Sequence, residues 1–202
     1  MSTLFDCGYY TETELAAEGF KSLGSNIRID KNCTIVGTPH ISIGSNVRID
    51  GYCTLLAIKP HGIQLGSYIH IGAYSHLSGG EGIVMEDFCG LSQGVRIYTR
   101  NDDYTGQALT NPMVPAKYTC VMRAAVILKR HVIIGSGSVV LPGVTISEGS
   151  CVGALSLVTK SLESWGVYFG CPVRRLYDRS KKLLELEEEF RQNLARDGKA
   201  AL

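Results

Sequence analysis

Charge excess and long apolar runs are both missing from the 202-residue sequence. No apolar stretch approaches the length of a membrane span, and the first ten residues lack the basic start and apolar run of a signal peptide. The formal net charge is only +1, and no basic tract with interleaved aromatic residues occurs. We therefore expect a cytoplasmic protein of one domain that neither inserts into a membrane nor binds nucleic acid.

Cysteine pairs and proline-rich segments are also missing. The seven cysteines are an odd number and include no CxxC pair, so we expect free thiols in a reducing compartment. Only six prolines accompany 23 glycines. The glycines recur in an ordered pattern, which argues against a loose glycine-rich linker.

A period of six residues dominates the sequence. It fits neither an amphipathic helix nor an alternating strand. It predicts a chain that turns a corner after each short strand, so that three sides make one triangular coil of about 18 residues. Successive coils then stack as parallel strands, and the sequence predicts an all-β parallel β-helix. The apolar residues at this period are Leu23, Ile29, Ile35; Ile43, Ile49, Leu55; Leu65, Ile71, Leu77; Met85, Leu91, Ile97; and Leu128, Ile134, Val140, Ile146, Val152, Val158.

The inward small-residue position of the repeat supports the same interpretation. Cys33, Cys53 and Cys89 occupy it in successive coils, and a free cysteine packs as a small hydrophobe. We therefore expect these three side chains in the core.

One corner of the predicted coil breaks the repeat. Extra residues follow the third side of the early coils, where the inward position holds Pro39, Lys59 and Glu81. After the fourth coil the same corner extends through residues 102–121. Insertions in solenoids collect on one face, which is often the binding face, and a long ordered loop is usually functional.

The two ends of the chain differ from the repeat. We expect an N-terminal cap over 1–22, the β-helix over 23–172 and a C-terminal helix over 173–202. Thr11 and Glu14 have the spacing of a capping box, which predicts a short helix in the cap. Helical spacing from 176 to 194 puts Leu183, Leu186, Phe190 and Leu194 on one face, with Glu187 and Glu189 on a solvated face.

A family resemblance lies in residues 139–176, VVLPGVTISEGSCVGALSLVTKSLESWGVYFGCPVRRL. The motifs PGVTI, VGA-x-S-x-VTK and G-x-P-x-R together resemble the galactoside and maltose acetyltransferases. HLSGGEGI and IYTRNDDYTG are similar to sugar acetyltransferases of bacterial surface-polysaccharide (lipopolysaccharide, O-antigen or capsule) biosynthesis. The resemblance implies a left-handed β-helix, a homotrimer and an acetyl-CoA groove between neighbouring subunits, with the acceptor sugar near the extended loop.

The resemblance also implies residues for the acetyl-CoA groove. Ser136 matches a position whose backbone N–H meets the thioester oxygen. Ala154 and Ser156 match positions that bond the pantetheine arm. The positions near the nucleotide phosphates are matched by Thr159, Lys160 and Arg174. For the two cations the chemistry agrees, because charged donors favour phosphate and arginine binds it with two parallel hydrogen bonds.

The extended loop departs from the family. Its members carry a catalytic histidine there, and the matching position in this sequence is Asp102. His76 matches a position that contacts the acceptor sugar, and the repeat stacks it with Thr54 and Arg96 on neighbouring coils. We therefore predict His76 as the catalytic base, with Asp102 or Asp103 as an orienting acid or sugar ligand. The sequence Asn-Asp-Asp at 101–103 equally suits a turn.

Three alternatives remain open. The acceptor group is either a sugar hydroxyl or the amine of a nucleotide-linked amino sugar, and the missing loop histidine leans toward the amine, a better nucleophile once deprotonated. A metalloenzyme like the γ-type carbonic anhydrases needs three histidines around one metal, and the expected pair four residues apart is missing, so we expect no metal. A non-catalytic β-helix used for assembly would not need the VTK and G-x-P-x-R motifs.

Overall fold

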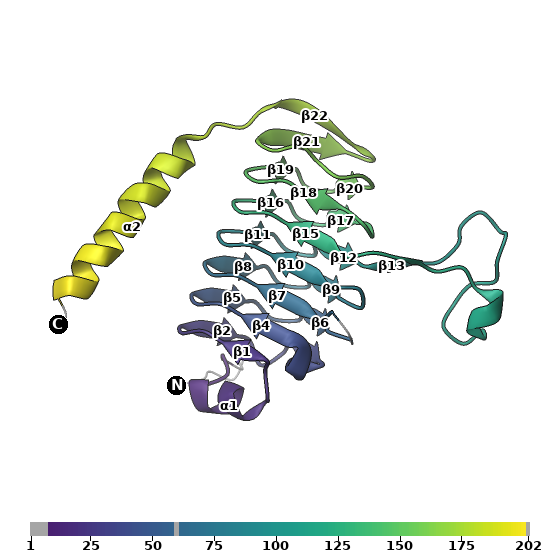
Figure 1. Cartoon of the computed structure of the whole chain (residues 1–202), viewed down its shortest axis with the longest axis horizontal. Helices are drawn as coiled ribbons and strands as arrows, with labels where there is room; N and C mark the ends of the chain where they lie inside the picture. Colours follow the sequence, from purple (N-terminus) through teal and green to yellow (C-terminus); the bar gives the residue numbers. More distant parts are fainter. Residues whose placement is uncertain (1–7, 59–60, 201–202) are drawn as a thin grey trace.

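The computed structural model describes residues 8–58 and 61–200, and it is a triangular β-solenoid (Figure 1). The predicted left-handed parallel β-helix fold is confirmed. Two sheets of six strands and one of eight form its three sides. The first sheet contains β1 (Ser22–Leu23), β4 (Ile41–Ile43), β7 (Ile63–Leu65), β10 (Ile83–Met85), β15 (Val126–Leu128) and β18 (Thr145–Ile146).

The other two sides follow in each coil. The eight-stranded sheet contains β2 (Ile27–Ile29), β5 (Val47–Ile49), β8 (Ile69–Ile71), β11 (Gly90–Leu91), β16 (Ile133–Ile134), β19 (Cys151–Val152), β21 (Gly166–Gly170) and β22 (Val173–Asp178). The third sheet contains β3 (Thr34–Val36), β6 (Thr54–Leu56), β9 (His76–Ser78), β12 (Arg96–Tyr98), β17 (Val139–Val140) and β20 (Leu157–Val158). Except for β22, the strands of these sheets pair in parallel.

The period-six residues form the core between the three sheets. Nearly all of them are buried, and each buried isoleucine or leucine contributes roughly 1.5–3 kcal/mol. Cys53 and Cys89 are buried as predicted. Leu23, Ile35 and Cys33 are only half-buried, because the first coil has no coil beneath it.

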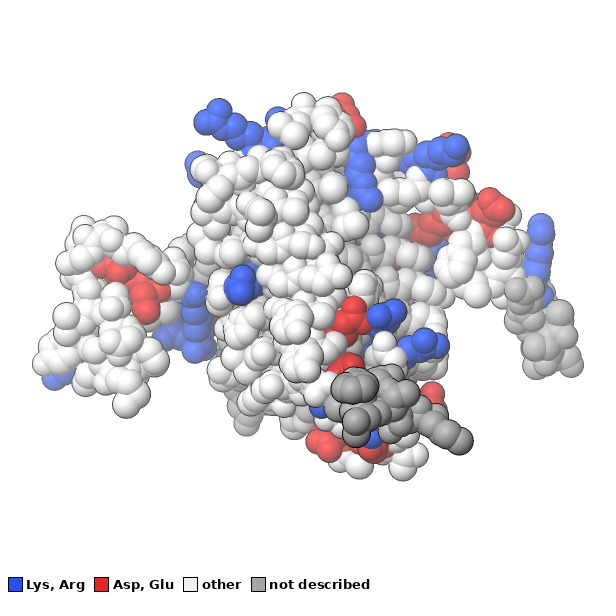
Figure 2. Space-filling view, turned by 180° about the vertical axis from the view of Figure 1, so that it is seen from behind, with Lys and Arg blue, Asp and Glu red and all other residues white. Residues whose placement is uncertain are grey.

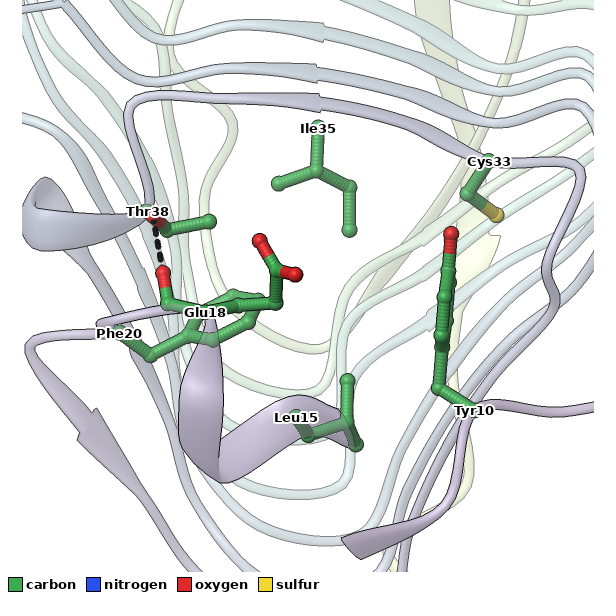
Figure 3. A pocket seen from close by; sticks show the side chains of 7 residues that line it. All are labelled: Tyr10, Leu15, Glu18, Phe20, Cys33, Ile35 and Thr38. Atoms are coloured by element: carbon green, nitrogen blue, oxygen red, sulfur yellow. Dashed lines mark hydrogen bonds between the residues drawn. The ribbon is translucent and has the colours of Figure 1, made fainter. Parts of the chain in front are cut away.

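A short helix covers this open end. α1 (Glu12–Ala17) begins with the predicted capping box, in which the Thr11 side chain accepts from the Glu14 N–H and the Glu14 carboxylate accepts from the Thr11 N–H at 2.7 Å. Leu15 points from α1 toward the coil and lines a pocket with residues of the first coil (Figure 3). The helix therefore closes the core. Residues 1–7 of the predicted cap and Lys59 lie outside the described residues.

The extended loop leaves the solenoid on a two-stranded stalk. β13 (Arg100–Asn101) and β14 (Met122–Arg123) pair antiparallel, and the loop beyond them contains the 3-10 turn η2 (Ala116–Tyr118). Glu81 accepts from Arg100 at 2.8 Å and from Arg123 at 3.3 Å, which ties both strands to the solenoid. Figure 1 shows the loop projecting well clear of the coils. A second 3-10 turn, η1 (Thr38–His40), holds Pro39 at the same corner.

The C-terminal region differs from its prediction. Val173–Asp178 forms β22, which folds back on β21 after a turn with a cis Cys171–Pro172 bond, so the helix α2 (Lys182–Ala200) begins later than expected. Figure 1 shows α2 outside the solenoid, slanting away from the coils toward its C-terminal end. Glu187 is not on a solvated face, because it forms ion pairs with Arg130 and His131. Over the described residues, neither helix is long and apolar enough to cross a membrane.

Candidate active site

One corner of the solenoid collects several of the predicted site residues. It joins the eight-stranded sheet to the third sheet in each coil, and we call it the site corner. Backbone hydrogen bonds link its successive levels, as from the Leu155 N–H to the Ser136 carbonyl at 2.8 Å and from the Gly94 N–H to the Ala73 carbonyl at 2.8 Å. Its triplets are residues 30–32, 50–52, 72–74, 92–94, 135–137 and 153–155.

Ser136 and Ala154 occupy equivalent places in adjacent levels of the site corner. Gly135 allows this close approach, because a Cβ there would collide with the Ala154 backbone. Neither the Ser136 nor the Ala154 amide N–H has a hydrogen-bond partner within the described part of the chain. Unpaired backbone donors of this kind are what a thioester oxygen or a pantetheine carbonyl needs.

Ser156 lies at the inward fifth position of its hexapeptide. Its side chain points inward and is 2% exposed. Its hydroxyl accepts from the Gly170 N–H at 3.1 Å, and its N–H donates to the Ser138 hydroxyl at 3.2 Å. Ser156 therefore holds the hairpin β21–β22 over the site corner and does not present a free hydroxyl to a ligand.

His76 begins β9 directly after the site corner. Its Cα partners are Thr54 and Arg96, as the repeat predicts. Partial burial and the nearby Arg96 charge lower the pKa of the imidazole below its ordinary value. The ring lies 5.7 Å from that of Tyr98, so it leans toward the coil that leads into the loop. The imidazole of His76 is therefore neutral at pH 7.

Asp102 and Asp103 have different surroundings at the start of the loop. Asp103 accepts from the N–H groups of Thr105, Gln107 and Ala108, and these bonds with the Thr105 hydroxyl lower its pKa to about 2. Asp103 therefore performs the turn chemistry that the sequence allowed. Asp102 is half-buried and makes no hydrogen bond or ion pair with any described residue, His76 included. Its carboxylate is therefore free for a ligand or a neighbouring subunit.

The predicted phosphate-binding residues lie at the C-terminal end of the solenoid. Thr159 and Lys160 follow β20, Arg174 lies on β22, and all three are exposed. Neither Lys160 nor Arg174 has an ion-pair partner among the described residues, whereas Arg175 is held by Asp178 and Tyr168. Figure 2 shows basic side chains gathered at this end. The structure does not bring the two free cations to one corner, because the hairpin carries Arg174 over the site corner and Lys160 follows the next side.

Residues 92–94 are part of the site corner that sequence reasoning missed. Gln93 accepts from the Ser136 hydroxyl at 3.2 Å. Ser92 lies one level below Gly135 and one above Gly72, with its side chain half-buried. The repeat register alone carried this signal, because these residues share the hexapeptide positions of 135–137.

No metal centre forms in the part of the chain that the structure describes, where no three His, Cys, Asp or Glu side chains gather. His70 pairs with Asp50 at 2.8 Å, and His131 pairs with Glu187 at 2.7 Å. These histidines belong to separate ion pairs on the outer face, and His76 lies apart from both.

Several known proteins are similar to this chain in sequence and in fold. No family model matches the chain. It is 42% identical over 189 residues to the dTDP-4-amino-4,6-dideoxy-D-glucose acyltransferase of Escherichia coli, covering 94% of this chain and 98% of that protein. AntD, an N-acyltransferase from Bacillus cereus solved with dTDP and 3-hydroxybutyryl-CoA, has a TM-score of 0.89 and 44% identity over 93% of this chain and 98% of that one.

A more distant likeness agrees with the motif resemblance. The galactoside O-acetyltransferase of Lactococcus lactis is 37% identical over 91 residues, covering 39% of this chain and 44% of that protein. The motifs, the solenoid and the near-complete match to the Escherichia coli protein lead to one family. The chain belongs to the hexapeptide-repeat, left-handed β-helix acyltransferases.

Proposed function

We propose that the protein transfers an acyl group from acyl-CoA to the amino group of a dTDP-linked amino sugar. The observation that carries the proposal is the near-complete alignment with two relatives whose names specify a dTDP-amino sugar or an N-acyltransferase bound to dTDP. The free amides of the site corner support the CoA part of the reaction. This acceptor is the amine alternative of the sequence analysis.

The chemistry also favours an amine over a hydroxyl. The nitrogen lone pair attacks the thioester carbonyl carbon, the C–S bond breaks, the nitrogen loses one proton and the CoA sulfur gains one. An amine attacks without the strong base that a hydroxyl needs. This agrees with the absence of a histidine at the loop position, where Asp102 stands.

We place the CoA arm along the upper levels of the site corner. The Ser136 N–H donates to the developing oxyanion, and the Ala154 N–H bonds the pantetheine arm. Lys160, Arg174 and Thr159 surround the nucleotide phosphates from two subunits. Ser156 supports this groove through the hairpin and does not touch the ligand.

The sugar lies between His76 and the loop. His76 takes the proton from the nucleophile, and Asp102 binds the sugar amine. Solved variants of AntD alter a serine and an aspartate that stand ten positions apart, and Ser92 and Asp102 of this chain have the same separation. Asp103 keeps the start of the loop in shape.

The proposal also includes the oligomeric state, the cell compartment and the pathway of the protein. A homotrimer in the cytoplasm, acting in surface-polysaccharide biosynthesis, agrees with the nucleotide-sugar acceptor. The six cysteines in the described residues are unpaired, as expected in a reducing compartment.

A mass-spectrometric screen tests the acceptor. The purified protein is incubated with acetyl-CoA or 3-hydroxybutyryl-CoA and with dTDP-, UDP- and GDP-amino sugars or simple glycosides. We expect an acyl mass added to a dTDP-amino sugar with release of free CoA. Acylation confined to the glycosides would instead establish a sugar O-acetyltransferase, the second reading that the family motifs support.

A further inference from the structure

Two tyrosines stand in the lower levels of the site corner. Tyr52 and Tyr74 have φ angles of 60° and 63°, in the left-handed region that disfavours bulky side chains. Their rings stack with centroids 5.1 Å apart and planes within 4°. They are nevertheless 58% and 63% exposed. The chain thus keeps a costly conformation at two places to present flat aromatic rings to solvent.

A second corner of the solenoid provides a comparison. There Tyr68 and Phe88 also have positive φ and also stack, with centroids 4.9 Å apart. Phe190 of α2 covers both rings edge-on. The aromatic column at that corner therefore serves helix docking, whereas no described aromatic residue other than Tyr52 contacts Tyr74.

The level above Tyr74 is open. The next residue in the column is Gly94, and a Cβ built there would meet nothing closer than 3.9 Å. Adjacent levels of parallel strands are about 4.8 Å apart. A planar ring placed at the Gly94 level therefore continues the stack of Tyr52 and Tyr74 without displacing a side chain.

The residues around this open level indicate which ligand it fits. It lies below Ser136 and Ala154, on the side of the site corner away from the cations proposed for CoA. Tyr74 is two residues before His76, and the exposed Arg96 begins the strand above His76 with no ion pair among described residues. A pyrimidine nucleoside diphosphate has the required flat base and the charge that Arg96 favours.

We infer that the ring of Tyr74, stacked on Tyr52, is the platform for the thymine base of the acceptor, and that the base fills the open level at Gly94. This inference rests on the proposed function. Arg96 then faces the diphosphate, which lies between the base and the sugar beside His76.

Calorimetric titration with dTDP tests the platform. Tyr74→Asn removes the ring and suits a positive φ, since Asn26 and Asn46 hold that conformation at the second corner. We expect it to weaken dTDP binding about five- to hundredfold, as loss of a base-stacking residue does. Tyr74→Phe keeps the ring and should bind as the wild type does. Tyr177→Asn is the control, because Tyr177 is as exposed, at 64%, but lies on β22.

A parallel titration with acetyl-CoA distinguishes a failure of the platform inference from a failure of the proposed acceptor. Acetyl-CoA affinity should be equal in all four proteins, and light scattering should give them one mass. Equal dTDP affinity in the wild type and Tyr74→Asn would overturn the platform but not the acceptor. A wild type that binds acetyl-CoA but not dTDP would overturn the acceptor and the platform with it. A changed mass in Tyr74→Asn would show that a second subunit covers the ring instead.

Discussion

At the scale of single residues, His76 is the general base that we propose. Because burial and Arg96 both disfavour the imidazolium, the lowered pKa leaves the ring neutral at pH 7. We predict that His76→Ala lowers kcat at least tenfold while acyl-CoA affinity is kept, since loss of a general base costs about 10²–10⁴-fold in rate. Steady-state kinetics with a dTDP-amino sugar and calorimetry with acetyl-CoA measure the two effects.

Asp102 is the alternative candidate for the general base. Asp102→Asn keeps the shape of the side chain and removes the proton acceptor. A large loss of kcat in Asp102→Asn beside a normal His76→Ala would move the base to the loop. Asp103→Asn replaces an accepting oxygen within the turn of the loop, so a loss of kcat in that variant would report on loop shape instead of proton transfer.

Lys160 and Arg174 are exposed cations that have no ion-pair partner among the residues that the structure describes. We predict that Lys160→Ala and Arg174→Ala each weaken acetyl-CoA binding about tenfold or more without unfolding the chain, since a charge-assisted hydrogen bond is worth roughly 1.5–3 kcal/mol. Calorimetric titration measures the affinity. Arg175→Ala, on the same strand but with its cation held by Asp178, should bind normally. Unchanged affinity in both test variants would remove them from the CoA site.

At the scale of elements, α2 depends on one half-buried carboxylate. Glu187 pairs with Arg130, with His131 at 2.7 Å and with Arg191 at 2.7 Å. Burial alone would raise its pKa, but the bonds from Arg191 and His131 and the charge of Arg130 lower it below the ordinary 4.5. A lowered carboxyl pKa stabilises the docked helix above pH 4.5, and this stability is lost as the pH falls through the folded value.

The lowered pKa of Glu187 makes the stability of α2 docking depend on pH. We predict that Glu187→Gln is less stable than the wild type at pH 7 by about 1.5–3 kcal/mol, and that the difference narrows on acidification below pH 4.5. Denaturant unfolding followed by Trp165 fluorescence measures it, because the Trp165 carbonyl accepts from the Arg179 N–H at the root of α2. Glu188→Gln is the exposed control. A difference that stays constant between pH 7 and pH 3.5 would contradict this role.

The strands of the solenoid were predictable from the sequence, whereas β22 and the docking of α2 were not. Residues such as Ile49 and Ile71 must face inward in every coil, so their period fixes the solenoid. β22 was not predictable, because its pairing with β21 depends on the turn at Cys171–Pro172 and outweighs the helical spacing. The contact of Glu187 with His131 joins positions far apart in the chain that no local pattern connects.

The candidate site was predictable only in part for a related reason. Motifs located Ser136 and Ala154, and the register put His76 beside Arg96, since both depend on the repeat. The hydrogen bond from the Gly170 N–H to Ser156 depends on the hairpin, and the choice of Asp103 over Asp102 as the turn acceptor depends on contacts within the loop. The tyrosine pair carried no motif, because its signal is an exposed ring at a positive φ, which only the structure reveals.

At the scale of the whole molecule, one chain does not bring the predicted site residues together. Asp102 has no partner among the described residues, and the free cations lie on two different sides of the solenoid. The loop projects from the coils (Figure 1), and its large apolar side chains Tyr104, Leu109 and Met113 are exposed. Figure 2 shows a largely uncharged solenoid surface beside it. Such apolar area on a projecting loop is typical of a subunit contact.

We therefore predict a homotrimer in which each loop lies on a neighbouring solenoid and completes its site. Multi-angle light scattering should give three times the 21.9 kDa of one chain, and a monomer at working concentration would contradict the prediction. Met113, on the loop and 90% exposed, tests the contact. If a neighbour buries it, Met113→Asp places an unpaired charge in that interface, so the trimer should dissociate at higher protein concentration than the wild type does. Because the site lies between subunits, kcat should fall over the same dilution range. Full activity in a dissociated variant would instead place the whole site within one chain.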